Sequence, residues 1–136
     1  MDAYLGSMLS SFSLKVPGAS EEDLAALAAA LGATPPADLV RLLREFDGAA
    51  GRIGNRPLEL WSARRIAAEM QEQDVSQAVP GLLLVGSDGG TEALGWLPRL
   101  PHKPWGRISL FAGSAREFEP LAASLADLLD ALAHGR

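Results

Sequence analysis

The stretch that decides the fold is "GLLLVGSDGGTEALGWL", residues 81–97, in which an apolar run gives way to glycines and then to a second apolar run. Residues 82–85 are apolar at every position, as in a strand that is covered on both faces. Asp88-Gly89 between two such runs is a strong hairpin signal, because glycine readily adopts the positive φ that tight turns need. The sequence therefore predicts two antiparallel strands joined by a structural turn. The residues assigned to that turn are Gly86, Asp88, Gly89 and Gly90.

A glycine-rich loop after a strand can also bind phosphate, but it then requires a helix directly after the glycines. The first amides of that helix, together with its dipole, hold the anion. Here the following residues, "TEALGWL" (91–97), favour a strand instead. The glycine spacing matches neither the dinucleotide-binding fingerprint nor the Walker loop, and no Lys-Ser or Lys-Thr pair follows. We therefore expect a turn that binds no nucleotide.

Apolar spacing and capping residues predict helices on both sides of the hairpin. Ser20 begins a capping-box pattern, and Gly32 is a natural stop for the helix that follows it. Thr34 can cap a second helix with Pro35 in its first turn, and Gly48 can end it. We expect these first two helices to pack side by side, because the turn between them is very short. The predicted helices span about 20–32, 34–48, 62–71 and 124–134, and residues 1–18 form an N-terminal amphipathic helix or arm.

Short strands are predicted at residues 58–61, 92–98 and 106–113, in addition to the apolar run at 82–85. The glycine-rich segment 48–57 is predicted to be a loop. Strands that follow one another through short turns must run antiparallel. The predicted class is therefore α+β, with a mainly antiparallel sheet and with N-terminal, middle and C-terminal helices packed against it. A chain of 136 residues is expected to form one domain, residues 1–136.

Composition narrows the classes of function. The chain has no cysteine, which removes disulfides, thiolate metal sites and thiol catalysis. Its formal net charge of −5 disfavours a surface that grips nucleic acid, and it favours attraction of basic partners. No segment has the length of apolar sequence that crosses a membrane, and the first residues do not read as a signal peptide. We therefore expect a cytoplasmic protein.

The residues that could carry catalysis are few. Val85 stands where a nucleophile elbow needs its first glycine, and His102 and His134 are not spaced as a ligand pair. Asp88 and Glu92 could share a calcium ion, but the other ligands of a calcium loop are missing. A pair of carboxylates meeting in space, as in a glycosidase, stays open as an alternative. The expectation is a protein with no catalytic residues, no metal and no cofactor, and hence not an enzyme.

Four stretches in fixed order resemble the SUKH superfamily, which includes bacterial immunity proteins and fungal regulators of cell-wall synthesis. They are "TPPADLVRLLREFDGA" (34–49), "LELW" (58–61) with the helix after it, "PGLLLVGSDGGTEALGW" (80–96) and "FEPLAASLADLLDAL" (118–132). The third resembles the most characteristic element of the family, an apolar strand that ends in Gly-Ser-Asp-Gly-Gly-Gly-Glu. This chain departs from the pattern at Thr91, where a glycine is common, and at Pro35 and Asp47, where leucine and asparagine are usual.

The resemblance implies a curved, mainly antiparallel sheet with packed helices, and it implies binding rather than catalysis. Many bacterial members are implied to bind and neutralise toxin domains, often nucleases. The leading hypothesis is an immunity protein that binds such a toxin, whose surface would be basic if it grips nucleic acid. The alternative is an intracellular regulatory or adaptor module that binds an endogenous protein, as the fungal members suggest. An enzyme with an unrecognised site is a third possibility.

Candidate partner-binding residues follow from residue type. Tryptophan and arginine are enriched at the centres of protein interfaces, while a tryptophan in a small domain can equally belong to the core. Two arginines stand in the first turn of the predicted middle helix, where the helix dipole disfavours cations. The two carboxylates beside the hairpin turn could meet basic side chains of a partner, although aspartate before glycine also favours the turn itself. The candidates are Trp61, Trp96, Trp105, Arg64, Arg65, Asp88 and Glu92.

Overall fold

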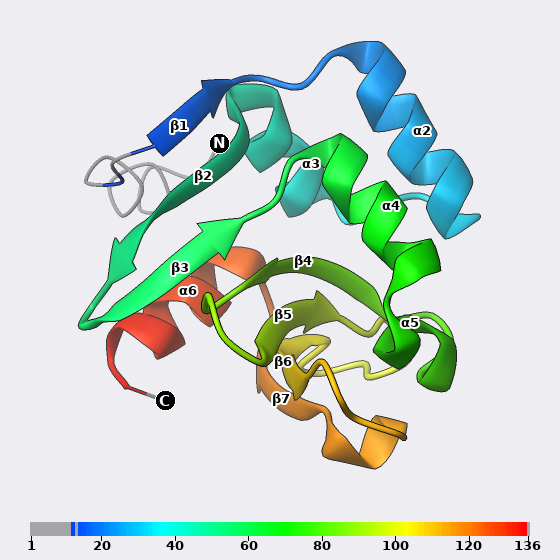
Figure 1. The fold of residues 1–136 in the computed structure, drawn as a ribbon, viewed down its shortest axis with the longest axis vertical. Helices are drawn as coiled ribbons and strands as arrows, with labels where there is room; N and C mark the ends of the chain where they lie inside the picture. The colour runs from blue at the N-terminus through cyan, green and yellow to red at the C-terminus, as the bar shows by residue number, and fades with distance from the viewer. Residues whose placement is uncertain (1–11, 13, 136) are drawn as a thin grey trace.

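The structure is a computed structural model that describes residue 12 and residues 14–135 (Figure 1). Its helices are α2 (Glu21–Leu31), α3 (Ala37–Glu45), α4 (Ala63–Glu72), α5 (Asp74–Ala78) and α6 (Leu125–Ala133), with a short 3-10 helix η1 (Ala115–Glu117). Its strands are β1 (Leu14–Pro17), β2 (Phe46–Ile53), β3 (Arg56–Leu60), β4 (Leu83–Ser87), β5 (Glu92–Trp96), β6 (Trp105–Ser109) and β7 (Glu119–Ala122).

The seven strands form one sheet in which every strand pairs with its neighbours in the chain, always antiparallel. The order is β1-β2-β3-β4-β5-β6-β7, and the two ends of the sheet do not meet. The predicted α+β class with an antiparallel sheet and flanking helices is confirmed. The central hairpin is also confirmed, since β4 and β5 pair directly across residues 88–91.

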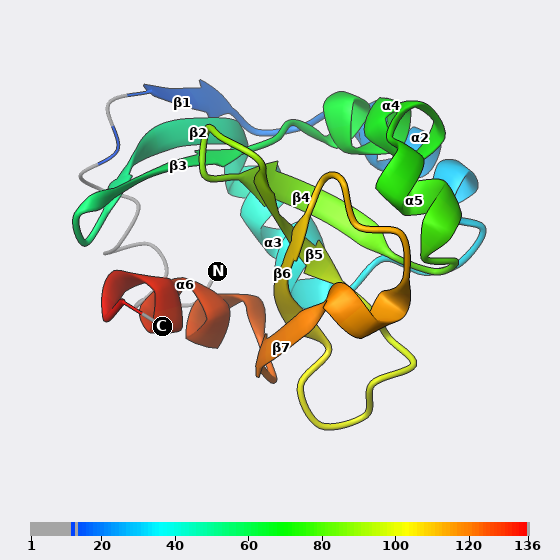
Figure 2. The ribbon, with the colours of Figure 1, turned by 60° about the horizontal axis from the view of Figure 1, so that its bottom comes forward.

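The helices form two layers on opposite faces of the sheet. Figure 2 shows α2, α4 and α5 together on one side and α3 and α6 on the other. Helix α2 packs against α4 and not against α3, so the prediction that the first two helices lie side by side is wrong. The backbone explains the difference. Gly32 takes a left-handed conformation (φ 73°) and Pro36 an extended one, which together redirect the chain to the other face.

Capping side chains place the two outer helices where the sequence predicted them. The Ser20 hydroxyl accepts a hydrogen bond from the amide of Asp23 at 3.1 Å at the start of α2. The Ser62 hydroxyl does the same for the amide of Arg65 at 3.1 Å at the start of α4. Gly32 ends α2 as expected. These caps satisfy amides that would otherwise have no partner within the helix.

The segment from 34 to 57 differs most from its prediction. Helix α3 begins at Ala37, after Pro36 and not at a Thr34 cap, and it ends at Glu45. The predicted loop 48–57 is instead most of the β2–β3 hairpin, whose turn contains Gly54 (φ 58°). Its glycines allow close packing within a strand. A Cβ on Gly51 would lie 2.7 Å from a ring carbon of Phe12, so the small residue reflects tight contact and not a loop.

The N-terminal prediction lies largely outside the described residues. Leu5, Met8 and Leu9 of the expected amphipathic helix fall in the undescribed part, while Phe12 is buried in the core. Residues 14–17 form strand β1, which pairs with β2, so the helix does not continue through this segment.

Two aspartates hold helices to their neighbours. One carboxylate oxygen of Asp38 accepts a hydrogen bond from the amide of Leu39 at 3.0 Å, and the other accepts one from Leu125 at 2.8 Å. Asp38 therefore ties α3 to the first turn of α6. Asp47 accepts a hydrogen bond from the amide of Ala63 at 2.8 Å and so fixes the start of α4 beside β2. Both aspartates lie in the 34–49 segment, and both roles are structural.

Candidate partner-binding surface

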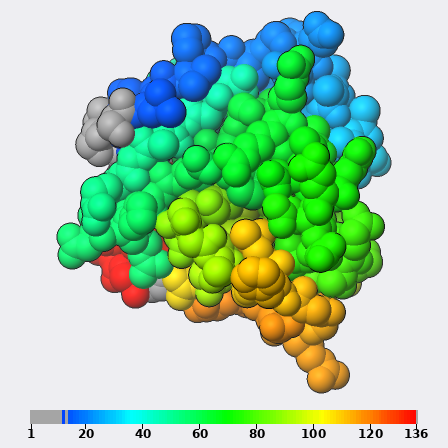
Figure 3. Space-filling model, viewed as in Figure 1, coloured from blue at the N-terminus to red at the C-terminus, as the bar shows by residue number. Residues whose placement is uncertain are grey.

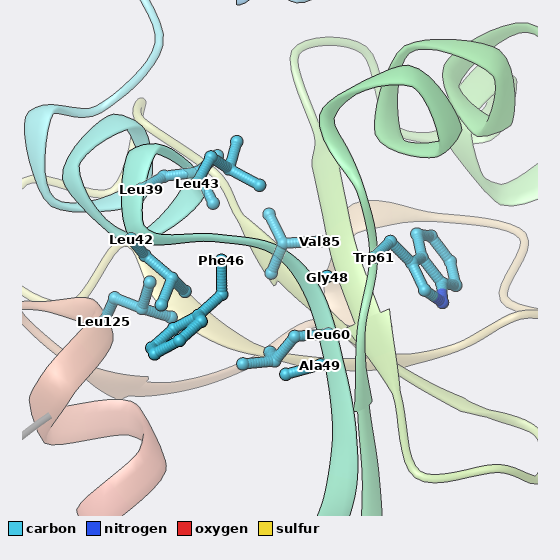
Figure 4. Close-up of a pocket in the computed structure, with 10 residues that line it drawn as sticks. All are labelled: Leu39, Leu42, Leu43, Phe46, Gly48, Ala49, Leu60, Trp61, Val85 and Leu125. Carbon is cyan, nitrogen blue, oxygen red and sulfur yellow. The ribbon is translucent and has the colours of Figure 1, made fainter. Parts of the chain in front are cut away.

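The cavity between the sheet and helices α3 and α6 is part of the hydrophobic core and not a binding pocket. It lies between α3, β2, β3, β4 and α6, and apolar side chains and one glycine line it (Figure 4). Its volume is about 10 Å³, at the lower limit of what one water molecule requires. In Figure 4 Trp61 stands apart from the leucines, across the backbone of β3. A substrate has no room in this cavity.

The glycine turn has the geometry of a hairpin. A carboxylate oxygen of Asp88 accepts a hydrogen bond from the amide of Gly90 at 2.9 Å, and the Ser87 hydroxyl accepts one from Gly89 at 3.3 Å. Gly89 has a φ of 83°, and the Asp88 amide bonds to the carbonyl of Glu92 at 3.2 Å. Strand β5 begins at Glu92, so the amides of the turn do not lead into a helix. The hydrogen bond that Asp88 accepts within the turn is therefore a structural reason for an aspartate at this position.

Gly86 belongs to β4 and not to the turn. It pairs with Leu60 of β3, and a Cβ at this position would lie 2.3 Å from the carbonyl oxygen of Glu59. Glycine is required at this position because β3 and β4 approach each other closely.

A shallow groove lies on the face of β1, β2 and β3 that α3 and α6 do not cover. The cross-strand register aligns Leu14, Ala50 and Glu59 in one row on this face. Trp61 and Arg65 stand at the end of the groove where α4 begins, and its volume is about 180 Å³. We call this groove, with the residues that line it, the open groove. Its lining is Leu14, Val16, Asp47, Gly48, Ala49, Ala50, Glu59, Leu60, Trp61, Ser62 and Arg65.

The open groove combines exposed apolar side chains with fixed charges. Leu14 is 56% exposed and Val16 is 40% exposed, which makes them two of the three large exposed apolar side chains in the described part of the chain. Figure 3 shows the segments of β1, β2 and α4 meeting on this face. The third such side chain is Phe111, which is 82% exposed in the loop after β6.

A hydrogen-bonded cluster occupies one wall of the groove. One carboxylate oxygen of Glu59 accepts from the indole Nε1 of Trp61 at 3.0 Å and from Nη1 of Arg65 at 2.8 Å. The guanidinium of Arg65 lies 4.6 Å from the centre of the Trp61 ring, and its Nε is 3.6 Å from Glu69. The cation at the start of α4 is therefore held by two carboxylates and an aromatic face, which offsets the unfavourable helix dipole.

The structure brings together only some of the predicted binding residues. Trp61 and Arg65 meet at the open groove, where Trp61 is only 4% exposed and also belongs to the core cluster. Arg64 points to α2, where it forms an ion pair with Asp23 at 3.4 Å. Trp96 and Trp105 pack against each other, with ring centres 6.4 Å apart. Trp105 is almost fully buried and belongs to the core.

Asp88 and Glu92 lie on the opposite side of the sheet from Glu59. They line a crevice of about 20 Å³ beside α6, together with Arg56 and Arg107. The register explains this placement, because Glu59 pairs with Ser87, and successive residues of a strand point to opposite faces. The carboxylates of the turn and the groove therefore form separate surfaces.

Sequence reasoning missed Leu14, Val16 and Phe111 as surface residues, and it considered Glu59 only as an ion-pair partner of the arginines, a pairing that Arg65 confirms. The alternation of "LKV" (14–16) is the signal for a strand with one apolar face, although these residues fall within the segment 1–18 that is predicted to be a helix or arm. The alternation of "LELW" placed Glu59 opposite the buried Leu58 and Leu60 and could have identified it.

Within residues 12 and 14–135, no group of three or more His, Asp or Glu side chains could hold a metal ion. Over the same residues, no helix combines the length and the apolar character needed to cross a bilayer.

Comparison with known proteins identifies the family. The model of the SMI1 / KNR4 family (SUKH-1) matches residues 18–131, from the end of β1 to the last turns of α6. No curated protein matches the chain. The match covers strands β2 to β7, helices α2 to α5 and most of α6. The chain therefore belongs to the SMI1 / KNR4 family (SUKH-1).

Proposed function

We propose that this protein is an immunity protein that binds and neutralises a toxin domain by stoichiometric contact through the open groove. Membership of the SUKH-1 family is consistent with an immunity or a regulatory role. The net charge of −5 favours a basic partner. The observation that carries the proposal is the open groove itself, where exposed apolar side chains adjoin a fixed carboxylate and an arginine stacked on tryptophan.

The loop after β6 extends the proposed contact surface. Figure 2 shows this loop and the β4–β5 turn rising on the same side of the sheet as α4. The two are joined by a hydrogen bond of 2.8 Å from the amide of Leu110 to the carbonyl of Thr91. The amide of Phe111 also donates to the Ser109 hydroxyl at 3.1 Å. The exposed Phe111 ring is therefore presented on a braced turn, as suits an apolar anchor in an interface.

Binding would neutralise the toxin by covering its active site or the surface beside it. A stable complex of this kind buries about 1,200–2,000 Å² in total. Opposite charges on the two proteins would speed their association, and added salt would slow it. For a toxin that acts on nucleic acid, the basic surface that grips phosphate is the surface that an acidic partner meets first.

The proposal is tested by co-expressing the protein with the product of the adjacent gene, and by measuring growth and the affinity of the purified pair. Wild type should restore growth and bind. Leu14→Asp should bind at least about tenfold more weakly, because it places a charge in the apolar part of the interface. Leu14 is mostly exposed, so this variant should keep its fold.

Ala29→Asp is the matched control, because it adds the same charge at an exposed position on α2 outside the groove. It should rescue growth as wild type does. If that product is toxic and wild type neither binds it nor restores growth, the immunity proposal fails for that pair. If Leu14→Asp and Ala29→Asp behave alike, the groove is not the contact surface.

A further inference from the structure

We propose that the open groove binds an arginine side chain of the partner, with Glu59 as the carboxylate that accepts it. This inference deepens the proposed function by naming the chemistry of the contact. It rests on the orientation of Glu59, on the charges around it and on the apolar wall opposite.

Glu59 is oriented but retains capacity to bind. Its Oε1 accepts hydrogen bonds from Trp61 Nε1 at 3.0 Å and Arg65 Nη1 at 2.8 Å, which fix the plane of the carboxylate. Its Oε2 accepts no hydrogen bond from any residue in the described part of the chain. The Glu59 side chain is 44% exposed, so the described residues do not close off its carboxylate. An ionised carboxylate has about four lone-pair sites, of which two are used here.

The charges around the groove favour a cation. Asp47 and Glu59 line it, and Glu69 stands 3.6 Å from the guanidinium of Arg65. Among the residues that line the groove there are therefore two carboxylates and one cation, and Glu69 pairs with the same cation from outside the lining. Both described contacts of Arg65 to acids lie on its own side of the groove, so its charge is largely compensated before a partner arrives.

The opposite wall suits the stem of an arginine. Leu14 and Val16 are exposed on β1, across β2 from Glu59. An arginine can lay its methylene groups along such apolar side chains while its guanidinium stays in a polar setting. A volume of about 180 Å³ is suited to one side chain and not to a folded segment.

Arginine fits better than lysine for a geometric reason. A guanidinium is planar and can give two parallel hydrogen bonds to a carboxylate, whereas an ammonium acts as a point charge. Arginine is also a residue with which proteins grip phosphate. Capture of such an arginine would remove a phosphate contact from a toxin that acts on nucleic acid.

The test uses a defined probe and no toxin. Acetyl-Leu-Arg-Leu-amide is titrated at low salt into the full ¹⁵N-labelled protein, together with its lysine and citrulline counterparts. Citrulline keeps the shape of arginine and removes the charge. The readout is the indole N–H resonance of Trp61, assigned with Trp61→Phe, because this group donates directly to Glu59. The arginine peptide should shift it saturably, with the citrulline peptide about tenfold weaker and the lysine peptide in between.

Two variants locate the contact. Glu59→Gln keeps an oxygen that can accept from Trp61 but loses the charge, and it should weaken arginine-peptide binding about tenfold. Glu92→Gln removes an exposed carboxylate on the other side of the sheet, and it should bind the peptide as wild type does. Absence of a saturable shift would overturn the inference. So would equal binding of the citrulline peptide, or equal weakening by the two variants.

The two proposals fail separately. A negative titration removes the arginine site but leaves co-expression to decide the immunity role. Failure of wild type to bind the adjacent gene product removes the immunity role for that pair, and the titration still decides whether the groove accepts arginine.

Discussion

The centre of the sheet and its β1–β3 end are built for different tasks. In β4 all five residues are buried, because helices or loops cover the strand on both faces. In β1, β2 and β3, helices α3 and α6 cover one face, and the other face carries the open groove. This difference indicates that packing around the central strand stabilises the sheet. The β1–β3 end can therefore expose apolar side chains such as Leu14 and Val16.

A matched pair of leucines gives the largest expected contrast. Leu84→Ala, in the central strand β4, should lower the free energy of unfolding by about 2–5 kcal/mol, because it leaves a cavity in a fully packed layer. Leu14→Ala, the same change in the groove, should alter it by less than about 0.5 kcal/mol. Urea denaturation of both variants checks this. Similar losses would mean that the centre of the sheet and its β1–β3 end contribute equally to stability.

The next effect concerns the junction between the β1–β3 end and the centre of the sheet. Gly86→Ala places a methyl group against the carbonyl of Glu59, where β4 meets β3, and should cost about 1–3 kcal/mol. Gly89→Ser is the contrasting variant. A Cβ at Gly89 would meet no neighbouring atom, but the backbone there has a positive φ, so any cost comes from the backbone conformation and not from close approach. Crystal or NMR structures of Gly86→Ala should show β3 displaced from β4. An unchanged strand separation with unchanged stability would contradict the close-approach explanation.

A smaller effect is expected where α4 meets the groove. Ser62→Ala removes the hydroxyl that accepts from the amide of Arg65 and should cost about 1 kcal/mol. Asp47 also accepts a hydrogen bond at this helix start, and it should keep α4 in place. Thermal denaturation measures the loss, and the position of the Trp61 indole resonance reports whether the wall of the groove has moved.

The smallest effect on stability is expected at Phe111. Phe111→Ala should change the free energy of unfolding by less than about 0.5 kcal/mol, because the ring is 82% exposed. It should nevertheless weaken binding to the partner identified by co-expression. Arg116→Ala, at an exposed position in η1 nearby, is the control for binding. Equal affinity of wild type and Phe111→Ala would remove the loop from the proposed surface.

The sequence predicted those parts of the fold that rest on local chemistry. Ser20 and Ser62 mark helix starts because their hydroxyls bind amides three residues on. Asp88-Gly89 marks the hairpin because the aspartate and the positive φ shape the turn locally. The unbroken apolar run of β4 signalled burial on both faces. Each of these signals depends on a few neighbouring residues.

Features that depend on distant contacts were not predictable in the same way. Gly48 and Gly51 resembled loop residues, but they lie in β2, where Ser62 and Phe12 approach the backbone closely. The separation of α2 from α3 depends on which face of the sheet the chain returns to. The groove joins Leu14 to Glu59 through strand pairing across a long interval of sequence. Residue type alone therefore suggested Trp61 and Arg65 as binding residues, but it did not suggest Leu14 and Val16, which line the same groove.

The sequential order of the strands has a consequence for how the chain reaches its structure. The β2–β3 hairpin and the run from β4 to β7 can assemble through short loop closures, which favour rapid folding, whereas helices separate β1 from β2 and β3 from β4. Helix α6, which returns to contact β2, is the element that must close over a long range, and we expect it to dock last.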